Sequence, residues 1–334
     1  MTPAPLALSL GDPAGVGPEI VAKAWAALRE SGPAFVVIGD AELLASATRA
    51  GGAGIRRVGA PSEAALAFGA SIPVIDAPLA SPVVSGQPSA AHAPQIIRWI
   101  ETGVGLALSR QVGGLVTAPI AKAPLYEAGF KFPGHTEFLA ELTLTAAQDG
   151  VRGPVMMLVA GDLRVSLVTI HEPLAKVAGL LSVEKIVNAG LCTAQALKRD
   201  FGIARPRLAV AGLNPHAGES GSIGREDVEV IAPAVAAMRA QGVDVRGPLA
   251  ADTLFHDEAR ATYDAALCMY HDQALIPVKM LDFWGGVNVT LGLPIVRTSP
   301  DHGTGFDIAG RGQARPDSLI AAIRLAAEIA ARRA

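Results

Sequence analysis

Apolar runs of strand length, separated by alanine-rich segments of helical character, constrain the fold of this 334-residue chain more than any other feature. Such alternation predicts an α/β protein with a mainly parallel sheet and helices on its faces. In sheets of this kind ligands collect at the carboxyl ends of the strands, and most of the unusual polar residues follow these runs. The runs are FVVIGD, GLVTAPI, PVMMLVA, RVSLVTI, RLAVAGLNP and AALCMYHD.

The composition favours a folded protein of enzyme size and excludes several other classes. Half of the residues are hydrophobic, so the chain can bury a large core in one or two domains. The formal net charge of -3 and the scattered Lys and Arg residues give no basic face, so we expect no nucleic-acid partner. We find no charge-free run long enough to span a membrane and no secretory leader, which predicts a cytoplasmic protein with no membrane contact. Cys192 and Cys268 lie far apart and are expected to be buried, reduced thiols.

The stretch LALSLGDPAGVGPEI, residues 6–20, runs from a strand through a glycine-rich turn into a helix, a layout that often binds phosphate. Its glycines, Gly11, Gly15 and Gly17, do not have the G-x-G-x-x-G spacing of a dinucleotide loop, and no Walker A lysine follows them. A dinucleotide-binding, kinase or acyltransferase function is therefore disfavoured for this turn. Asp40, at the end of the next strand-like run, stands where a Rossmann fold would place a ribose ligand, but a helix cap is the favoured interpretation.

Three histidines follow strand-like runs: His171 in VSLVTIHEPL, His216 in LAVAGLNPHAGE and His271 in AALCMYHDQ. They are too far apart in sequence to form a local metal-binding motif, so the fold would have to bring them together. Taken singly, each histidine at the end of a strand is explained by a structural role in which its ring makes a hydrogen bond. Together, at the ends of strands in one sheet, they also suggest three imidazoles that hold a metal ion and leave coordination positions for substrate.

The segment FPGHTEFLAELT places His135 and Thr136 just before an amphipathic helix, with Glu137 in its first turn. Thr136 is a candidate N-cap, and the same helix start is equally a candidate anion site because its N–H groups are free. Further along, between residues 271 and 310, charged and amide side chains gather among glycines, which is difficult to explain as core packing. These side chains are Asp272, Lys279, Asn288, Arg297, Asp301, His302 and Asp307.

A series of motifs occurs in order between residues 6 and about 312: GDPAGVGPEI, TAPIAK, GHTEFLAELT, VTIHEPL, GLNPHAGE, GPLAADTLF, YHDQ and GVNVTLGLPIVRTSPDHGTG. Together they resemble the 4-hydroxythreonine-4-phosphate dehydrogenase family of pyridoxal phosphate biosynthesis. The resemblance implies the two-domain α/β fold of isocitrate and isopropylmalate dehydrogenases, with a central cleft, and a homodimer. We expect one domain at residues 1–125 plus 300–334 and the other at 126–299.

The resemblance also implies the site residues. The histidines matching His171, His216 and His271 would hold one divalent ion per subunit, Zn, Mg or Co, at a site shared across the dimer interface. The substrate, a small phosphorylated hydroxy amino acid, would be bound largely through its phosphate by His135, Thr136, Lys279, Asn288 and Arg297. NAD or NADP would bind the loop DHGTGFDIAG, at Asp301, His302, Gly303 and Asp307, and the first glycine turn would line the cleft.

The implied reaction is the NAD(P)-dependent oxidation of 4-hydroxythreonine 4-phosphate to 2-amino-3-oxo-4-(phosphooxy)butanoate, which loses CO2 to give 3-amino-2-oxopropyl phosphate. The metal ion would act as a Lewis acid on the hydroxyl, and a carboxylate would accept its proton, Asp272 being favoured over Asp252. The alternative on the same scaffold is a threonate or erythronate 4-phosphate dehydrogenase, whereas the phosphate-binding residues disfavour a cis-dihydrodiol. The alternative from another class is a non-catalytic, metal-dependent protein that binds a phosphorylated metabolite.

Overall fold

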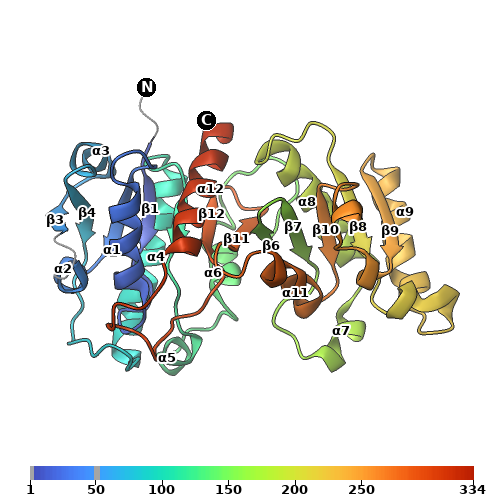
Figure 1. Ribbon diagram of the computed structural model, residues 1–334, viewed down its shortest axis with the longest axis horizontal. Helices are drawn as coiled ribbons and strands as arrows, with labels where there is room; N and C mark the ends of the chain where they lie inside the picture. Colours follow the sequence, from blue (N-terminus) through green and yellow to red (C-terminus); the bar gives the residue numbers. More distant parts are fainter. Residues whose placement is uncertain (1–3, 49–52) are drawn as a thin grey trace. The chain divides into compact units, whose positions relative to one another are not determined.

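The computed structural model describes residues 4–48 and 53–334, which divide into two compact units. The first unit contains the described residues up to 147 together with 294–332, and the second contains 148–293. In Figure 1 the first unit holds the blue, cyan and red parts of the chain, and the second holds the green to orange part. These bounds differ from the expected 126 and 299, because residues 126–147 and 294–299 belong with the first unit.

The first unit is built on a parallel sheet in the order β3-β4-β2-β1-β5-β12. Its elements are β1 (Leu6–Ser9), α1 (Gly17–Leu28), β2 (Phe35–Gly39), α2 (Ala41–Thr48), β3 (Gly54–Arg57), η2 (Pro61–Glu63), α3 (Ala64–Ala67), β4 (Ser71–Asp76), η3 (Ala90–His92), α4 (Ala93–Leu108), β5 (Leu115–Thr117), α5 (Lys122–Glu127), α6 (His135–Leu142), β12 (Arg297–Pro300) and α12 (Asp317–Arg333). Strands β1, β2, β5 and β12 are buried along their whole length, as is typical of parallel sheets whose faces are covered by helices. Helix α4 packs on β1, β2 and β5 through its buried apolar side.

The second unit is built on a mixed sheet in the order β11-β6-β7-β10-β8-β9. Its elements are β6 (Val155–Ala160), β7 (Leu163–Leu167), α7 (Leu174–Leu180), α8 (Val183–Arg199), β8 (Arg207–Ala211), η4 (Pro215–Gly221), η5 (Asp227–Ile231), α9 (Ala232–Ala240), β9 (Asp244–Leu249), η6 (Ala251–Thr253), α10 (Asp257–Arg260), β10 (Ala265–Cys268), α11 (His271–Leu281) and β11 (Val287–Leu291). Strand β6 is antiparallel to both of its neighbours, β11 and β7, and the other pairs are parallel. The core lies between these strands and α11 and includes Val165, Cys268 and Val278.

All six predicted strand runs form strands, namely β2, β5, β6, β7, β8 and β10. The predicted alternation with helices fails once, because β6 and β7 are consecutive and form a hairpin. Only Gly161 and Asp162 separate the two strands, and Gly161 has a φ of +57°. A connection this short joins antiparallel strands, since a parallel pair needs a crossover.

Asp40 caps α2, as predicted from the sequence. Its Oδ1 atom accepts a hydrogen bond from the N–H of Leu43 at 2.8 Å, and its Oδ2 atom accepts one from the N–H of Leu79 at 2.9 Å. Both carboxylate oxygens therefore have backbone partners, which explains an acidic residue here without a ribose.

In the ranges that the structure describes, no single helix has both the length and the hydropathy of a membrane span. The pair α7 and α8 meets those two criteria only when both helices are counted together, and they are bent by 93° at the break between them.

Both cysteines are free and buried in the second unit, as predicted. Burial raises the pKa of the Cys192 thiol to about 12 and raises that of Cys268 as well. Because the thiolate is the reactive form, we expect neither residue to react with DTNB at pH 8 in the folded protein and both to react in denaturant. Spectrophotometric thiol titration checks this, and rapid labelling of the native protein would contradict the assigned burial.

Candidate functional site

A buried arginine marks a charged cluster of side chains in the first unit. Arg297 is the first residue of β12 and is 2% exposed, and its Nη2 atom donates to the Thr117 hydroxyl at 2.7 Å. Strands β12 and β5 are parallel neighbours, which brings these two residues together. Burial lowers the pKa of Arg297 to about 10, against the opposing effect of the Glu137 carboxylate, so the guanidinium is still charged at neutral pH. A buried cation of this kind favours binding of an anion.

His135 lies in the same cluster, at the start of α6. The Nε2 atom of its ring is buried and has no hydrogen-bond partner among residues 4–48 and 53–334. Burial, followed by the charges of Arg297 and Lys122, lowers the pKa of His135 well below its usual range. The imidazole is therefore neutral at pH 7, and its Nε2 atom is available for a hydrogen bond to a ligand.

The start of α6 shows that one interpretation of the segment FPGHTEFLAELT, in which Thr136 is the N-cap, is wrong. Gly134, not Thr136, is the N-cap of α6, and no side chain caps the helix. Thr136 lies inside the first turn, because the helix begins two residues earlier than a Thr136 cap would place it, after the extended backbone of Gly134. The first N–H groups of α6 thus lack a side-chain cap, which agrees with the anion-binding interpretation.

Lys122, the first residue of α5, belongs to this cluster and was not predicted from the sequence. A Cβ atom on Gly134 would lie 3.5 Å from its Nζ atom and 3.3 Å from Glu137 Oε2, so the ammonium group lies beside the start of α6. Its position in TAPIAK, just after β5, was the available signal. We call Arg297, Lys122, His135 and Thr117 the cationic cluster, with Glu137 as its carboxylate.

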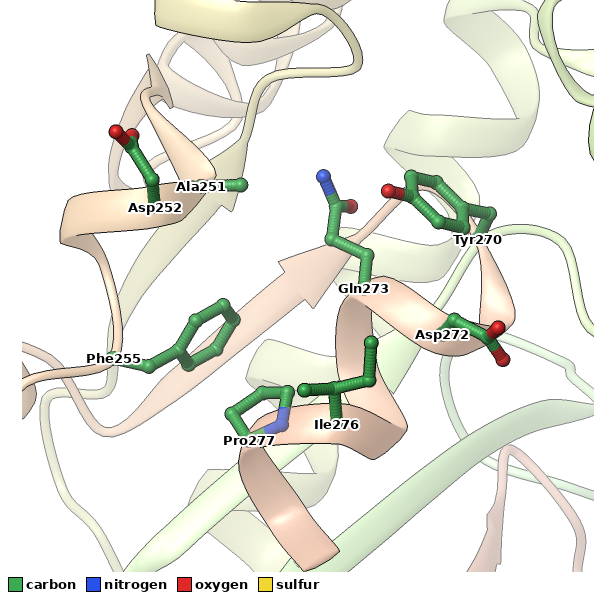
Figure 2. A pocket seen from close by; sticks show the side chains of 8 residues that line it. All are labelled: Ala251, Asp252, Phe255, Tyr270, Asp272, Gln273, Ile276 and Pro277. Atoms are coloured by element: carbon green, nitrogen blue, oxygen red, sulfur yellow. The ribbon is translucent and has the colours of Figure 1, made fainter. Parts of the chain in front are cut away.

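The second unit contains a pocket of about 290 Å³ between η6 and the start of α11. Figure 2 shows its lining: Ala251, Asp252, Phe255, Tyr270, Asp272, Gln273, Ile276 and Pro277. Both carboxylates predicted as proton acceptors line this pocket, Asp252 at one end and Asp272 at the other (Figure 2). Asp272 Oδ1 lies 2.7 Å from His271 Nδ1, whereas the Asp252 carboxylate has no hydrogen-bond or ion-pair partner in the described part of the chain.

Gln273 joins two of the loops that carry predicted metal ligands. Its Oε1 atom accepts the N–H of Met269 at 2.7 Å, and its Nε2 atom donates to the carbonyl of Gly212 at 2.7 Å. The side chain is buried, so both bonds are shielded from water. It thereby fixes the chain that leads from β8 toward His216 relative to the chain that leads from β10 to His271.

The structure brings together two of the three predicted metal ligands. His171 follows β7 and His271 follows β10, which are parallel neighbours, and the ring centroids of the two histidines are 5.7 Å apart. His216 lies exposed on the turn η4. Among residues 4–48 and 53–334, no three His, Cys, Asp or Glu side chains are grouped to hold one ion. The imidazole pair has the nitrogen donors that a borderline divalent ion prefers, and the third ligand would have to join it.

The five predicted substrate residues are divided between the units. His135, Thr136 and Arg297 belong to the first unit, and Lys279 and Asn288 belong to the second. Lys279 is in the last turn of α11, with its ammonium 5.1 Å from the centre of the Phe283 ring. Asn288 lies on β11, and its Oδ1 atom is buried without a hydrogen-bond partner in the described ranges. An amide oxygen of this kind is available to a donor on a ligand.

The predicted cofactor residues, Asp301, His302, Gly303 and Asp307, lie on the loop after β12 in the first unit. The N-terminal glycine turn packs directly against this loop, because the N–H of Val16 donates to the Thr304 carbonyl at 2.8 Å. A Cβ atom on Gly15 would come within 2.8 Å of the same oxygen, so only glycine allows this approach. The Nε2 atom of His302 is buried and has no hydrogen-bond partner in the part of the chain that the structure describes.

Two residues of α1 extend this support to the end of the loop. Glu19 is buried and accepts hydrogen bonds from the N–H groups of Gly312 at 3.1 Å and Ala314 at 2.8 Å. Lys23 donates to Glu19 at 2.8 Å and to the carbonyls of Gly312 and Ala314 at 2.9 and 2.7 Å. The glycine-rich turn at residues 11–17 and helix α1 therefore support the loop at residues 301–314.

Two α/β units, one with a cationic cluster and the other with histidines and carboxylates that follow its strands, define the two-domain class of dehydrogenase represented by isocitrate and isopropylmalate dehydrogenases. Residues 32–326 match the family described as pyridoxal phosphate biosynthetic protein PdxA, and the chain belongs to this family. It is 74% identical over 333 residues to 4-hydroxythreonine-4-phosphate dehydrogenase of Caulobacter vibrioides, covering 100% of this chain and 99% of the relative.

Solved structures agree with this assignment. A 4-hydroxythreonine-4-phosphate dehydrogenase from Klebsiella pneumoniae has 42% identity and a TM-score of 0.87, with 98% of both chains covered. A terephthalate 1,2-cis-dihydrodioldehydrogenase from Burkholderia xenovorans LB400 has 32% identity and a TM-score of 0.64, with 97% of this chain and 98% of the other covered. The family resemblance and the fold class predicted from the sequence are thereby confirmed.

Proposed function

We propose that this chain oxidises 4-hydroxythreonine 4-phosphate with NAD or NADP. The hydride leaves the carbon of the secondary alcohol for the nicotinamide, and the hydroxyl proton leaves for a carboxylate. In the resulting 2-amino-3-oxo-4-(phosphooxy)butanoate the bond to the carboxylate then breaks, CO2 departs, and a proton is taken up to give 3-amino-2-oxopropyl phosphate. The names of the relatives and one observation support the proposal: the cationic cluster in the first unit.

The cationic cluster suits a phosphate monoester in charge and in hydrogen bonding. Arg297 and Lys122 supply two positive charges against the single carboxylate of Glu137. The neutral His135 ring has an open Nε2 atom, and α6 presents its first N–H groups without a side-chain cap. Charge-assisted hydrogen bonds to a dianion would balance the burial of the arginine.

Asp252 is our proposed proton acceptor, and Asp272 our proposed positioning residue for His271. The sequence favoured Asp272 as the base, but its carboxylate lies 2.7 Å from His271 Nδ1. A carboxylate in this place fixes the orientation of an imidazole and leaves the other ring nitrogen for a metal ion. Asp252 lines the same pocket and has no such partner in the described ranges, so its oxygens are available to the substrate hydroxyl.

His171, His216 and His271 are our proposed ligands of one divalent ion per subunit. When bound there, the ion would supply Lewis-acid polarisation of the substrate oxygens. Three imidazoles favour zinc or cobalt over magnesium, which prefers oxygen ligands. All three histidines follow strands of the second unit, β7, β8 and β10, which supports the ligand set whichever of them serves the partner subunit.

The expected metal content is about one divalent ion per subunit after reconstitution, because each chain supplies one set of three histidines. Elemental analysis of the dialysed protein measures it. In the His216→Ala variant the ion should be largely lost, since two imidazoles bind more weakly than three. Full metal content and full activity in that variant would contradict the ligand set.

The loop at 301–310 is our proposed NAD(P) site, and a second copy of the chain is our proposed partner. Large apolar side chains are exposed along α11 and the residues after it: Ile276 at 63%, Met280 at 81%, Phe283 at 58% and Trp284 at 51%. We call this surface the α11 apolar face. A homodimer that covers it would remove it from water, and the helix concerned also carries His271 and Lys279. The two free thiols agree with the cytoplasm as the proposed location.

The experiment that tests the function is NADH or NADPH formation by the purified protein across a panel of alcohols. The panel contains 4-hydroxythreonine 4-phosphate, threonate and erythronate 4-phosphates, an aromatic cis-dihydrodiol, and 4-hydroxythreonine without its phosphate. The first compound should have the highest kcat/KM. A preference for a sugar-acid phosphate would support the alternative on this scaffold, and no turnover of any compound would support a binding protein.

A further inference from the structure

The turn that carries His216 has a backbone conformation that its sequence does not predict. All residues from His216 to Ser220 have positive φ, between +43° and +77°, and only Gly218 among them is a glycine. Other residues meet a steric penalty in this region and normally enter it singly. A run of four non-glycine residues there means that surrounding contacts hold the backbone in this shape.

Asp227, the first residue of η5, makes contacts that can hold this turn in its left-handed conformation. Its side chain is fully buried, and its Oδ1 atom accepts the N–H of Leu213 at 2.8 Å. Its Oδ2 atom accepts both the N–H of Asn214 at 3.1 Å and the side-chain amide of Asn214 at 2.9 Å. A Cβ atom on Gly212 would lie 2.7 Å from Oδ1, and one on Gly218 would lie 3.2 Å from Oδ2. The carboxylate therefore packs against both ends of the segment that contains His216.

We infer that Asp227 is a positioning residue that holds the left-handed turn and thereby fixes the direction of His216. The inference rests on the proposed role of His216 as a metal ligand. The carboxylate fixes the two residues before Pro215, and from there the left-handed run determines where His216 points. A ligand has to be held to within about 0.5 Å of its working position, and an exposed side chain on a loop gains this accuracy only from the backbone beneath it.

Cobalt binding by the full-length, metal-stripped protein tests the inference without the reaction. Asp227→Asn keeps the size of the side chain but turns an amide donor toward a backbone N–H. We expect it to raise the Kd for Co²⁺ about tenfold or more and to change the visible absorption of the bound ion, as His216→Ala also should. The matched control is Glu226→Gln, because Glu226 accepts a hydrogen bond from the Asn214 side chain and none from the N–H groups of residues 213–218. Its Kd should stay within about twofold of the wild type.

A second variant tests the turn itself, even if Asp227→Asn folds poorly. Ser220 is exposed and has a φ of +57°, so glycine at this position loses no packing and removes a steric penalty. We expect Ser220→Gly to raise Tm by about 1–3 °C, since the relief exceeds the entropy that glycine adds to the unfolded chain. In a right-handed turn the same change would lower Tm.

The outcomes distinguish the positioning role of Asp227 from the ligand role of His216, on which it rests. Unchanged Co²⁺ binding in His216→Ala would overturn the ligand role of His216, and the positioning role with it. Weaker binding in His216→Ala, with wild-type binding and absorption in Asp227→Asn, would overturn the positioning role alone. A lower Tm for Ser220→Gly would overturn the left-handed turn, and a higher one supports it.

Discussion

Replacing Arg297 by methionine should raise the KM for the phosphorylated substrate by about ten- to a hundredfold, with little change in the KM for NAD or NADP. The guanidinium is buried beside His135 and Lys122, so its loss removes a charge-assisted contact worth about 1.5–3 kcal/mol. Methionine fills much of the same space, which limits the effect on folding. Steady-state kinetics with each substrate varied in turn, together with Tm, measures the expected change.

Two comparisons make this result specific to the phosphate. Arg29→Met removes an exposed arginine of the same unit, 45% exposed, and should leave both KM values unchanged. Thr136→Ala should cost less than Arg297→Met, because a hydroxyl contributes a neutral hydrogen bond. If the wild-type protein turned over 4-hydroxythreonine as well as its phosphate, the cationic cluster would not be an anion site for this reaction.

The strands were predictable because the signal for each is local. Runs such as FVVIG and VMMLVA are uninterrupted, apolar and bounded by turn residues, and they become β2 and β6. The direction of β6 was missed because direction is set by the length of the connection to β7, which leaves no room for a crossover. For the site, residues in distinctive motifs were predicted from the sequence, and two of them, His135 and Arg297, lie near each other in the cationic cluster.

The rest of the site depends on contacts between residues far apart in the chain. The motif TAPIAK places Lys122 just after β5, but its part in the site becomes evident only when α6 is folded beside it. The sequence around Glu19 also does not indicate its role, because its carboxylate accepts a hydrogen bond from the N–H of Ala314, 295 positions along the chain. The left-handed turn at His216 is contrary to local preference and exists only with Asp227 buried beneath it. Such residues become recognisable only from the three-dimensional structure.

Mixing two inactive variants, His271→Ala and His216→Ala, should restore activity, up to about half of the wild-type value per heterodimer under two-fold symmetry. We expect the metal site to take ligands from both subunits, and His271 is our proposed crossing ligand because it begins the helix that carries the α11 apolar face. One site of the heterodimer then collects both substitutions, and the other is intact. Activity after co-refolding or subunit exchange, with the heterodimer verified by mass spectrometry, is the measurement.

A second mixture identifies the crossing ligand. The rings of His171 and His271 in one chain are 5.7 Å apart, so an arrangement in which these two share an ion and His216 comes from the partner subunit gives the same result in the first mixture. Mixing His171→Ala with His271→Ala separates the two. If His271 crosses the interface, one intact site forms and activity returns; if His171 and His271 act from the same chain, every site has one defect and activity stays absent. A fully active monomer in sedimentation, or no recovery in either mixture despite proven exchange, would mean that each chain builds its metal site alone.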